Sequence, residues 1–251
     1  MTDILISGIC GHMGRNVLEL VQADEETRCV CGVDLKEGAL CSVPVYDSFD
    51  KVTEKVDVVI DFSSAANLDN LLAFAKKSGC ALVLAATGYT PEQLAQIEES
   101  AKTVPVFKTA NLSVGINLLQ KLVREAAQFL GEAFDVEIVE RHHNLKKDAP
   151  SGTAYMLAES VNEAFEGSKK YVFGREGMVG AREKAEIGIH AVRGGTIVGE
   201  HEVMFAGEDE IITLSHSARS KKVFAAGAVR AAKFVCGKAP GKYDMQDVLR
   251  D

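Results

Sequence analysis

The sequence lacks the features of a membrane or exported protein. None of its 251 residues falls in an uninterrupted apolar run of about 18 residues, the minimum for a transmembrane helix. It also does not begin with a basic segment followed by an apolar core, so no export signal is predicted. We therefore expect a cytoplasmic protein that makes no contact with a membrane.

The sequence also lacks paired metal-ligand cysteines and a basic stripe. Its six cysteines form no CxxC pair: Cys29 and Cys31 alternate in one expected strand, and Cys10, Cys41, Cys80 and Cys236 are scattered. This distribution favours reduced thiols over a zinc site or a disulfide framework. The net charge of −8 argues against a nucleic-acid surface. We expect neither a metal ion nor a nucleic-acid partner.

The N-terminal segment has the pattern of a dinucleotide-binding turn. A short apolar strand, residues 4–6, precedes the sequence GICGHMG at residues 8–14, and an amphipathic run follows. The three glycines would allow a tight turn, close approach to a pyrophosphate and packing of the helix on the strand. Asp34 lies 20 residues after Gly14, at the end of the next expected strand, and suits ribose hydroxyls. The spacing GxxGxxG departs from the common GxGxxG, but the strand, helix and distal Asp support the same function.

A basic segment stands out against this acidic chain. Residues 140–154 read ERHHNLKKDAPSGTA. Lysine and arginine supply fixed positive charge, and histidine titrates near neutral pH. The segment ends at an expected helix start, where backbone N–H groups and the helix dipole favour a carboxylate or phosphate. The pattern predicts a site that holds a small polyanion and gives it a proton. The alternative is a solvated loop followed by an ordinary N-cap.

Alternating strand and helix signals in the first half predict a Rossmann-like, doubly wound parallel sheet. Its expected strands include residues 56–62, 80–85 and 104–108, and Thr90, Pro91 and Gln93 predict a capped helix start.

Longer strands follow and predict a second, mixed α/β domain on an open sheet. They are residues 134–140, 185–192, 196–206 and 211–216, with antiparallel turns expected at residues 194–195 and 207–209. Helical spacing returns at residues 222–234. We expect a dinucleotide-binding domain of residues 1–112 and 218–251, and a substrate-binding and oligomerisation domain of residues 113–217.

Several ordered motifs together resemble one enzyme family. They are GICGHMG, IDFS at residues 60–63, the segment 140–154, IGIHAVRGG at 187–195, GEH at 199–201 and GKYDM at 241–245. Over nearly its whole length the chain resembles dihydrodipicolinate reductase, also called 4-hydroxy-tetrahydrodipicolinate reductase. The resemblance implies a nicotinamide-dependent reduction of a cyclic dicarboxylate imine to tetrahydrodipicolinate in lysine and diaminopimelate biosynthesis. It also implies a homotetramer and no metal.

The resemblance implies roles for individual residues. His142 would be the acid/base histidine and Lys146 the proton donor, while the substrate would contact His143, Ser151, Gly152 and Thr153. The cofactor would contact Gly8, Gly11, His12, Met13, Gly14, Asp34, Ala85, Ala86, Thr87, Thr109, Ala110, Asn111 and Leu112. One departure stands out: relatives often have Gly-Thr-Thr-Gly where this chain has Ala85-Ala86-Thr87-Gly88, which removes a hydroxyl from the cofactor site.

The end of the second expected strand predicts the cofactor preference. Asp34 would repel a 2′-phosphate, and Leu35 stands where an arginine could have paired with it. Lys36 is the nearest cation and lacks the forked geometry of arginine. We expect NADH to be at least as good as NADPH, with NADPH still usable. Two alternatives remain open: another two-domain nicotinamide dehydrogenase, and a catalytically silent dinucleotide-binding regulatory protein.

Overall fold

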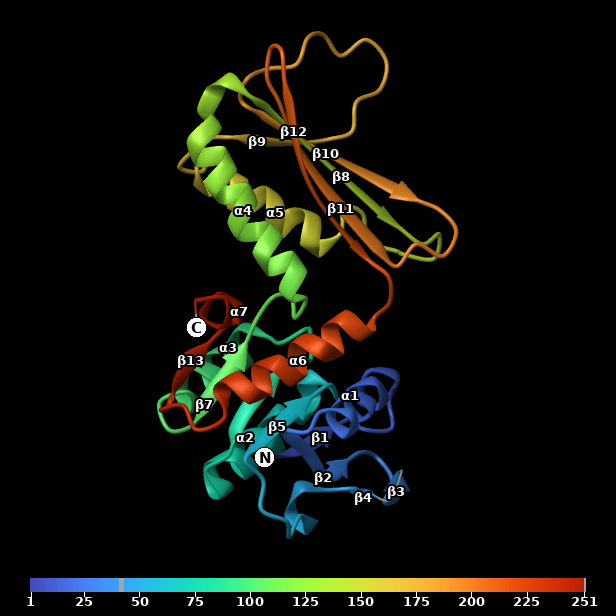
Figure 1. Ribbon diagram of the computed structural model, residues 1–251, viewed down its shortest axis with the longest axis vertical. Coiled ribbons are helices and arrows are strands. Elements are labelled where there is room, and N and C mark those ends of the chain that lie inside the picture. The colour runs from blue at the N-terminus through green and yellow to red at the C-terminus, as the bar shows by residue number, and fades with distance from the viewer. Residues whose placement is uncertain (41–42, 251) are drawn as a thin grey trace. The chain divides into compact units, whose positions relative to one another are not determined.

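The structure is a computed structural model that describes residues 1–40 and 43–250 (Figure 1). The chain divides into two compact units, Met1–Ser113 with Lys221–Asp251, and Val114–Ser220. Within the described residues, no helix is long and apolar enough to cross a membrane. Cys10, Cys29, Cys31, Cys80 and Cys236 are free thiols, and Cys41 lies outside the described residues.

The first unit is built on a parallel sheet, as the sequence predicts. Its central strands are fully buried, with Ile4, Ile6, Val59 and Ile60 at 0% exposure, because helices cover both faces. Among the strand pairs of this sheet that the structure describes, the one at the β3 edge is antiparallel. In spatial order the strands are β13 (Gly241–Tyr243), β7 (Pro105–Lys108), β6 (Ala81–Leu84), β5 (Val58–Asp61), β1 (Thr2–Ser7), β2 (Thr27–Val33), β4 (Val43–Tyr46) and β3 (Gly38–Leu40).

The helix α3 of this unit begins where the sequence predicts it. Thr90 and Gln93 form a capping box with Pro91 at the first helical position, which confirms the predicted start of α3. The late helix α6 packs against α1 and the strands β5, β6 and β7. The bounds are α1 (His12–Ala23), η1 (Phe49–Lys51), η2 (Ala65–Asn67), α2 (Leu68–Ser78), α3 (Pro91–Ser100), α6 (Lys222–Val235) and α7 (Met245–Val248).

The second unit is a mixed sheet with two helices on one face, which confirms the predicted α/β class. Burial alternates along β8 and β11, so every second side chain packs under the helices. Ile138, Leu157, Val203 and Phe205 lie in this core. The strand order is β12 (Ile211–Ala218), β11 (Gly199–Ala206), β8 (Asp135–His142), β10 (Glu186–Arg193) and β9 (Lys170–Phe173). The helices are α4 (Val114–Leu130) and α5 (Gly152–Glu163), with the short η3 (Gly131–Ala133) after α4.

One predicted turn is wrong. The glycines at 194 and 195 do not join neighbouring antiparallel strands, because β8 lies between β10 and β11 and runs parallel to β10. The connection instead crosses the end of β8: the Gly194 N–H donates to the His142 carbonyl (2.9 Å), and the Asn144 N–H donates to the Gly195 carbonyl (3.2 Å). The other predicted turn does join an antiparallel pair, β11 and β12.

Candidate functional site

The glycine turn of the first unit is so tight that side chains do not fit in it. Gly8 has φ +77°, a conformation that favours glycine. A Cβ on Gly14 would lie 2.1 Å from the Gly8 carbonyl oxygen and 2.7 Å from Ile9 Cα. The first turn of α1 therefore packs directly against the backbone that connects it to β1. This is the packing that the third glycine of a dinucleotide-binding turn permits, and together with Gly8 and Gly11 it forms a glycine cradle of the kind that such turns present to a pyrophosphate.

The start of α1 has the electrostatics of an anion site. In the described structure its N-cap, Gly11, makes no side-chain capping hydrogen bond, and no acidic residue lies in the first turn. The N–H groups and the positive end of the dipole are then available to an anion. The Cys10 and Leu35 N–H groups each donate to the Asp34 carboxylate at 2.8 Å. Asp34 thereby ties the turn to the end of β2.

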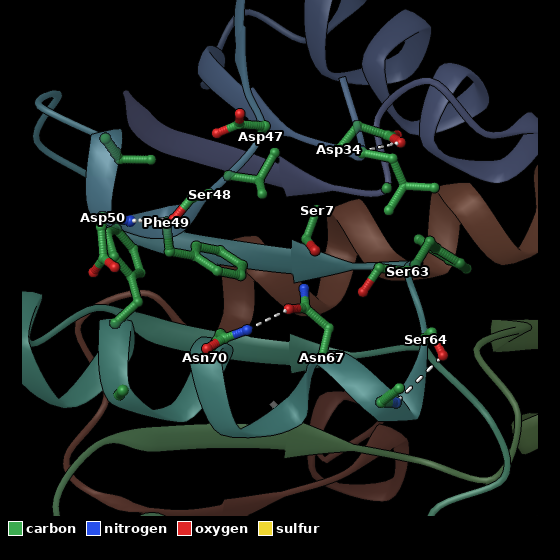
Figure 2. Close-up of a pocket in the computed structure, with 18 of the residues that line it drawn as sticks. Ser7, Asp34, Asp47, Ser48, Phe49, Asp50, Ser63, Ser64, Asn67 and Asn70 are labelled. Atoms are coloured by element: carbon green, nitrogen blue, oxygen red, sulfur yellow. Dashed lines mark hydrogen bonds between the residues drawn. The ribbon is translucent and has the colours of Figure 1, made fainter. Parts of the chain in front are cut away.

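A cavity of about 830 Å³ opens beside the turn. Gly8, Gly11 and Asp34 line it, as a dinucleotide site requires, and Figure 2 shows Asp34 and Asp47 on one side and Asn67 and Asn70 on the other. The lining also contains residues that no sequence motif marked, in the loop and η1 after β4, at the end of η2 and on α2: Asp47, Ser48, Phe49, Asp50, Asn67, Asn70, Phe74 and Lys77. Four of the charged side chains in this lining are acidic, namely Asp34, Asp47, Asp50 and Glu54, and one, Lys77, is basic.

The other predicted cofactor residues lie on nearby loops, outside this lining. Residues 85–87 and 109–112 follow β6 and β7, at the same carboxyl edge of the sheet as the glycine turn, where ligands of such folds bind. The Ala85 N–H donates to the Asp61 carbonyl (2.9 Å), and the Thr109 hydroxyl donates to the Asn111 carbonyl (3.1 Å). Gly227 of α6 lets the Leu112 carbonyl approach, since a Cβ there would lie 1.7 Å from its oxygen. His12, Met13 and Gly14, in the first turn of α1, are also absent from the cavity lining among the described residues.

In the second unit, a buried carboxylate holds the predicted acid/base histidine. Glu140 and His142 are two residues apart on β8 and share its buried face. The His142 Nδ1 atom lies 2.6 Å from Glu140 Oε2. Arg193 donates to both oxygens of Glu140, at 2.7 and 2.8 Å, and the Ser151 N–H donates to Oε1 at 3.0 Å. Burial alone would raise the pKa of Glu140, but hydrogen bonds from Arg193 and His142 outweigh it and lower that pKa.

Ser151 and His201 form a second buried pair beside the first. The Ser151 hydroxyl caps α5 by accepting from the Ala154 N–H (3.1 Å), and it lies 2.8 Å from His201 Nε2. Burial and the neighbouring His142 lower the pKa of His201 to about 4. The Ser151 side chain therefore has two partners within the protein, the Ala154 N–H and the His201 ring. The His142 and His201 rings are 5.2 Å apart, edge to face.

The basic loop is anchored to this network. Arg193 also donates to the Asp148 carbonyl (2.7 Å), and the Asp148 carboxylate pairs with Lys146 at 2.9 Å. The Lys146 side chain is 20% exposed. Gly152 is exposed at the first position of α5, and His143 and Thr153 are half-buried. The fold therefore brings His142, Lys146 and the start of α5 to one end of the sheet.

Glu140, Arg193 and His201 are site residues to which the sequence analysis gave no role. All three lie in motifs that the resemblance rests on. The pattern E-x-H on an expected strand could have indicated that Glu140 lies beside His142, because side chains two positions apart on a strand share one face. Register then sets Arg193 beside His142 and His201 beside Glu140. Among the described residues, no group of three or more His, Cys, Asp or Glu side chains is arranged to hold a metal ion.

Comparison with known proteins identifies the family. The family model described as dihydrodipicolinate reductase, N-terminus, matches residues 2–112, and the one described as its C-terminus matches residues 115–249. The chain belongs to the dihydrodipicolinate reductase family. It is therefore a nicotinamide-dependent oxidoreductase of lysine and diaminopimelate biosynthesis, as the sequence predicts.

Individual relatives support this assignment over the full length. The chain is 49% identical to the 4-hydroxy-tetrahydrodipicolinate reductase of Caldanaerobacter subterraneus subsp. tengcongensis, with 100% of the chain and 99% of the relative covered. It is 44% identical to that of Clostridium novyi, with the same coverage. The dipicolinate-bound dihydrodipicolinate reductase from Paenisporosarcina sp. TG-14 superposes with a TM-score of 0.82 at 27% identity, covering 97% of each chain. These comparisons support neither alternative raised by the sequence.

Proposed function

We propose that the second unit binds a cyclic imine dicarboxylate, dihydrodipicolinate or its 4-hydroxy-tetrahydro precursor, and delivers the proton that completes its reduction to tetrahydrodipicolinate. The observation that carries this proposal is the convergence of His142, Lys146 and the start of α5 around the Glu140–Arg193 pair. The relatives named above carry the same activity in their names.

The start of α5 is the proposed carboxylate site. Gly152 is exposed, and a Cβ there would meet nothing within 4 Å, so a ligand has free access to its backbone. The helix dipole favours an anion at this position. Thr153 adds a hydroxyl, and His143 lies on the adjoining loop. We assign Ser151 an indirect part in this binding, because its hydroxyl already caps α5 and contacts His201.

The cavity of the first unit is the proposed cofactor site. The glycine cradle and the start of α1 would hold the pyrophosphate, and Asp34 would accept the ribose hydroxyls. When bound, the reduced nicotinamide supplies the hydride. Residues 85–87 and 109–112 would line its nicotinamide end. The missing hydroxyl at Ala86 is the main difference from the pattern of relatives.

Lys146 is the proposed proton donor. Addition of hydride to the conjugated imine leaves an electron-rich enamine that must gain a proton on carbon, and a charged ammonium group can give it. His142 would act with it as an acid/base group, and the positive loop would stabilise the negative charge of the substrate. Hydride and proton together account for the two electrons and two hydrogens that dihydrodipicolinate gains. The 4-hydroxy precursor must first lose one molecule of water to give dihydrodipicolinate.

A coupled assay tests this function. Dihydrodipicolinate is generated in situ, and oxidation of NADH is followed by absorbance. Lys146→Met should lower kcat by about 10²-fold or more while NADH affinity stays nearly unchanged, as expected for a general acid. Lys147→Met, the exposed neighbour, is the matched control and should retain normal kcat. A normal kcat in Lys146→Met would refute the assignment.

We also infer that NADH is used at least as well as NADPH. Asp34, Asp50 and Glu54 line the cavity with one cation, Lys77, and Asp47, which also lines it, pairs with Lys51 at 3.0 Å. A 2′-phosphate would meet these like charges. Measurement of kcat/KM for both cofactors tests the inference, and a preference of tenfold or more for NADPH would overturn it.

We further propose that the enzyme is a homotetramer assembled through the second unit. The sheet face turned away from α4 and α5 exposes apolar side chains, including Val192 at 44% and Ile211 at 64%. Exposed apolar groups on an open sheet favour association between copies. Light scattering coupled to size-exclusion chromatography measures the state directly, and a monomer at micromolar concentration would exclude it.

A further inference from the structure

We propose that Glu140 is a positioning residue that fixes the tautomer of His142, so that the neutral ring carries its proton on Nδ1 and leaves Nε2 as the acceptor. The inference deepens the proposed function. It rests on that function only for the acid/base role of His142. The tautomer itself does not depend on that role.

The hydrogen bonds around Glu140 leave one arrangement of protons. Oε2 faces His142 Nδ1 at 2.6 Å and Arg193 Nη1 at 2.7 Å, and Oε1 faces Arg193 Nη2 at 2.8 Å and the Ser151 N–H at 3.0 Å. Glu140 is 0% exposed and its pKa is lowered, so it is an ionised carboxylate that only accepts. His142 Nδ1 must therefore donate to it. Such a contact selects the tautomer of an imidazole.

The position of the ring is fixed on its other side by β11. A Cβ on Gly199 would lie 3.1 Å from His142 Nε2 and 3.4 Å from Cδ2. The ring is thus held between a carboxylate at Nδ1 and a strand position that has no side chain. The His201 ring, 5.2 Å away, packs edge to face against it. Both the proton position and the orientation of His142 are therefore set by the surrounding side chains.

Replacement of Glu140 by glutamine reverses the tautomer for a geometric reason. The amide has one oxygen and one NH₂ group, and each would occupy one of the two carboxylate positions. An NH₂ group at the Oε1 position would face the Ser151 N–H and Arg193, neither of which can accept a hydrogen bond. An NH₂ group at the Oε2 position would face one such donor, Arg193 Nη1, instead of two, and it would also face His142 Nδ1, which can accept once its proton moves to Nε2. Glutamine therefore selects the Nε2–H form.

Nitrogen-15 NMR of histidine-labelled enzyme tests the proposal without reference to turnover. The His142 ring signals are assigned by their loss in His142→Gln and are recorded at pH 8. We expect Nδ1–H in the native enzyme and in Glu140→Asp, and Nε2–H in Glu140→Gln. Glu137→Gln is the matched control, because Glu137 lies on the same strand and accepts from Arg175, Arg182 and His190. Its His142 signals should match those of the native enzyme.

Kinetics separates the tautomer from the catalytic role. Glu140→Gln should lower kcat by about 10²-fold with less than a threefold change in KM for the dicarboxylate, and Glu140→Asp should recover part of the loss. An Nε2–H form in the native enzyme, or an unchanged tautomer in Glu140→Gln, overturns the proposal. If the tautomer is reversed in Glu140→Gln but kcat is normal, Glu140 does set the tautomer of His142. The proposed acid/base role of His142 is then wrong. If Glu140→Gln does not fold, the spectrum of the native enzyme still tests the predicted Nδ1–H tautomer of His142.

Discussion

Acidification from pH 7 to pH 5 should destabilise the second unit through His201. This side chain is 5% exposed, and burial together with the nearby His142 lowers its pKa to about 4. The groups that face it are Glu140 and His142 from β8, His216 from β12 and Lys146 from the basic loop. Only Glu140 among them is negative, and Arg193 already neutralises it.

The sign and size of the change in the free energy of unfolding follow from the linkage between folding and proton binding. The unfolded histidine, with a pKa near 6.5, binds a proton as the pH falls through that value, while the folded one stays neutral until about pH 4. The stabilising contribution is fully present above pH 6.5 and decreases as the pH falls toward 4. Between pH 7 and pH 5 the free energy of unfolding should fall by about 2 kcal/mol on this account. Glu137, Glu140 and Asp148 have lowered pKa values and titrate below this window.

Urea denaturation at pH 7, 6 and 5, followed by circular dichroism, measures the effect. His201→Gln keeps an acceptor for the Ser151 hydroxyl but cannot titrate. Its unfolding free energy should therefore fall by about 2 kcal/mol less than that of the native chain over the same range. Replacement of the exposed His12 by glutamine is the control and should leave the native dependence unchanged. If the free energy of unfolding depends on pH in the same way in His201→Gln and in the native chain, burial of a neutral His201 is not the cause of the acid destabilisation.

Two further predictions concern the cofactor unit. Gly14→Ala should lower the free energy of unfolding by about 3 kcal/mol and abolish NADH binding, measured by thermal denaturation and calorimetry, because its Cβ would lie 2.1 Å from a backbone oxygen. Gly194→Ala, whose Cβ would meet nothing within 4 Å, is the control, and equal stability of the two variants would contradict the packing argument. Leu35→Arg should raise the ratio of kcat/KM for NADPH to that for NADH, since Leu35 is 93% exposed beside Asp34 and an arginine there can pair with a 2′-phosphate. An unchanged ratio of kcat/KM in Leu35→Arg would mean that the 2′-phosphate of NADPH does not bind beside residue 35.

The sequence was sufficient to predict the helices and strands that are specified by short, local patterns of residues. The buried strands around Ile4 and Val59 are continuous apolar runs, and the start of α3 is specified by Thr90, Pro91 and Gln93 within four positions. The strands β3 and β13 were missed because three residues are too few for a period to show, and the four-residue strands β4 and β9 were missed as well. The error at Gly194 and Gly195 has a similar origin: the local turn signal was present, but the neighbour of β10 is decided by a strand about fifty residues earlier in the chain.

The site divides in the same way between local and distant causes. The glycine turn and the basic loop are each one short segment, so their residue types could be recognised in order. The cavity wall at Asp47, Asn67 and Phe74 comes from a loop and a helix that no motif marks. The Glu140 network combines β8, β10 and the start of α5, with one hydrogen bond spanning 53 positions to Arg193. Once β8, β10 and β11 are known to be neighbours, however, the E-x-H period and the strand register place Glu140, His142, Arg193 and His201 together. Knowledge of the strand order and register would therefore have placed these four residues together, since side-chain alternation along each strand is already readable from the sequence.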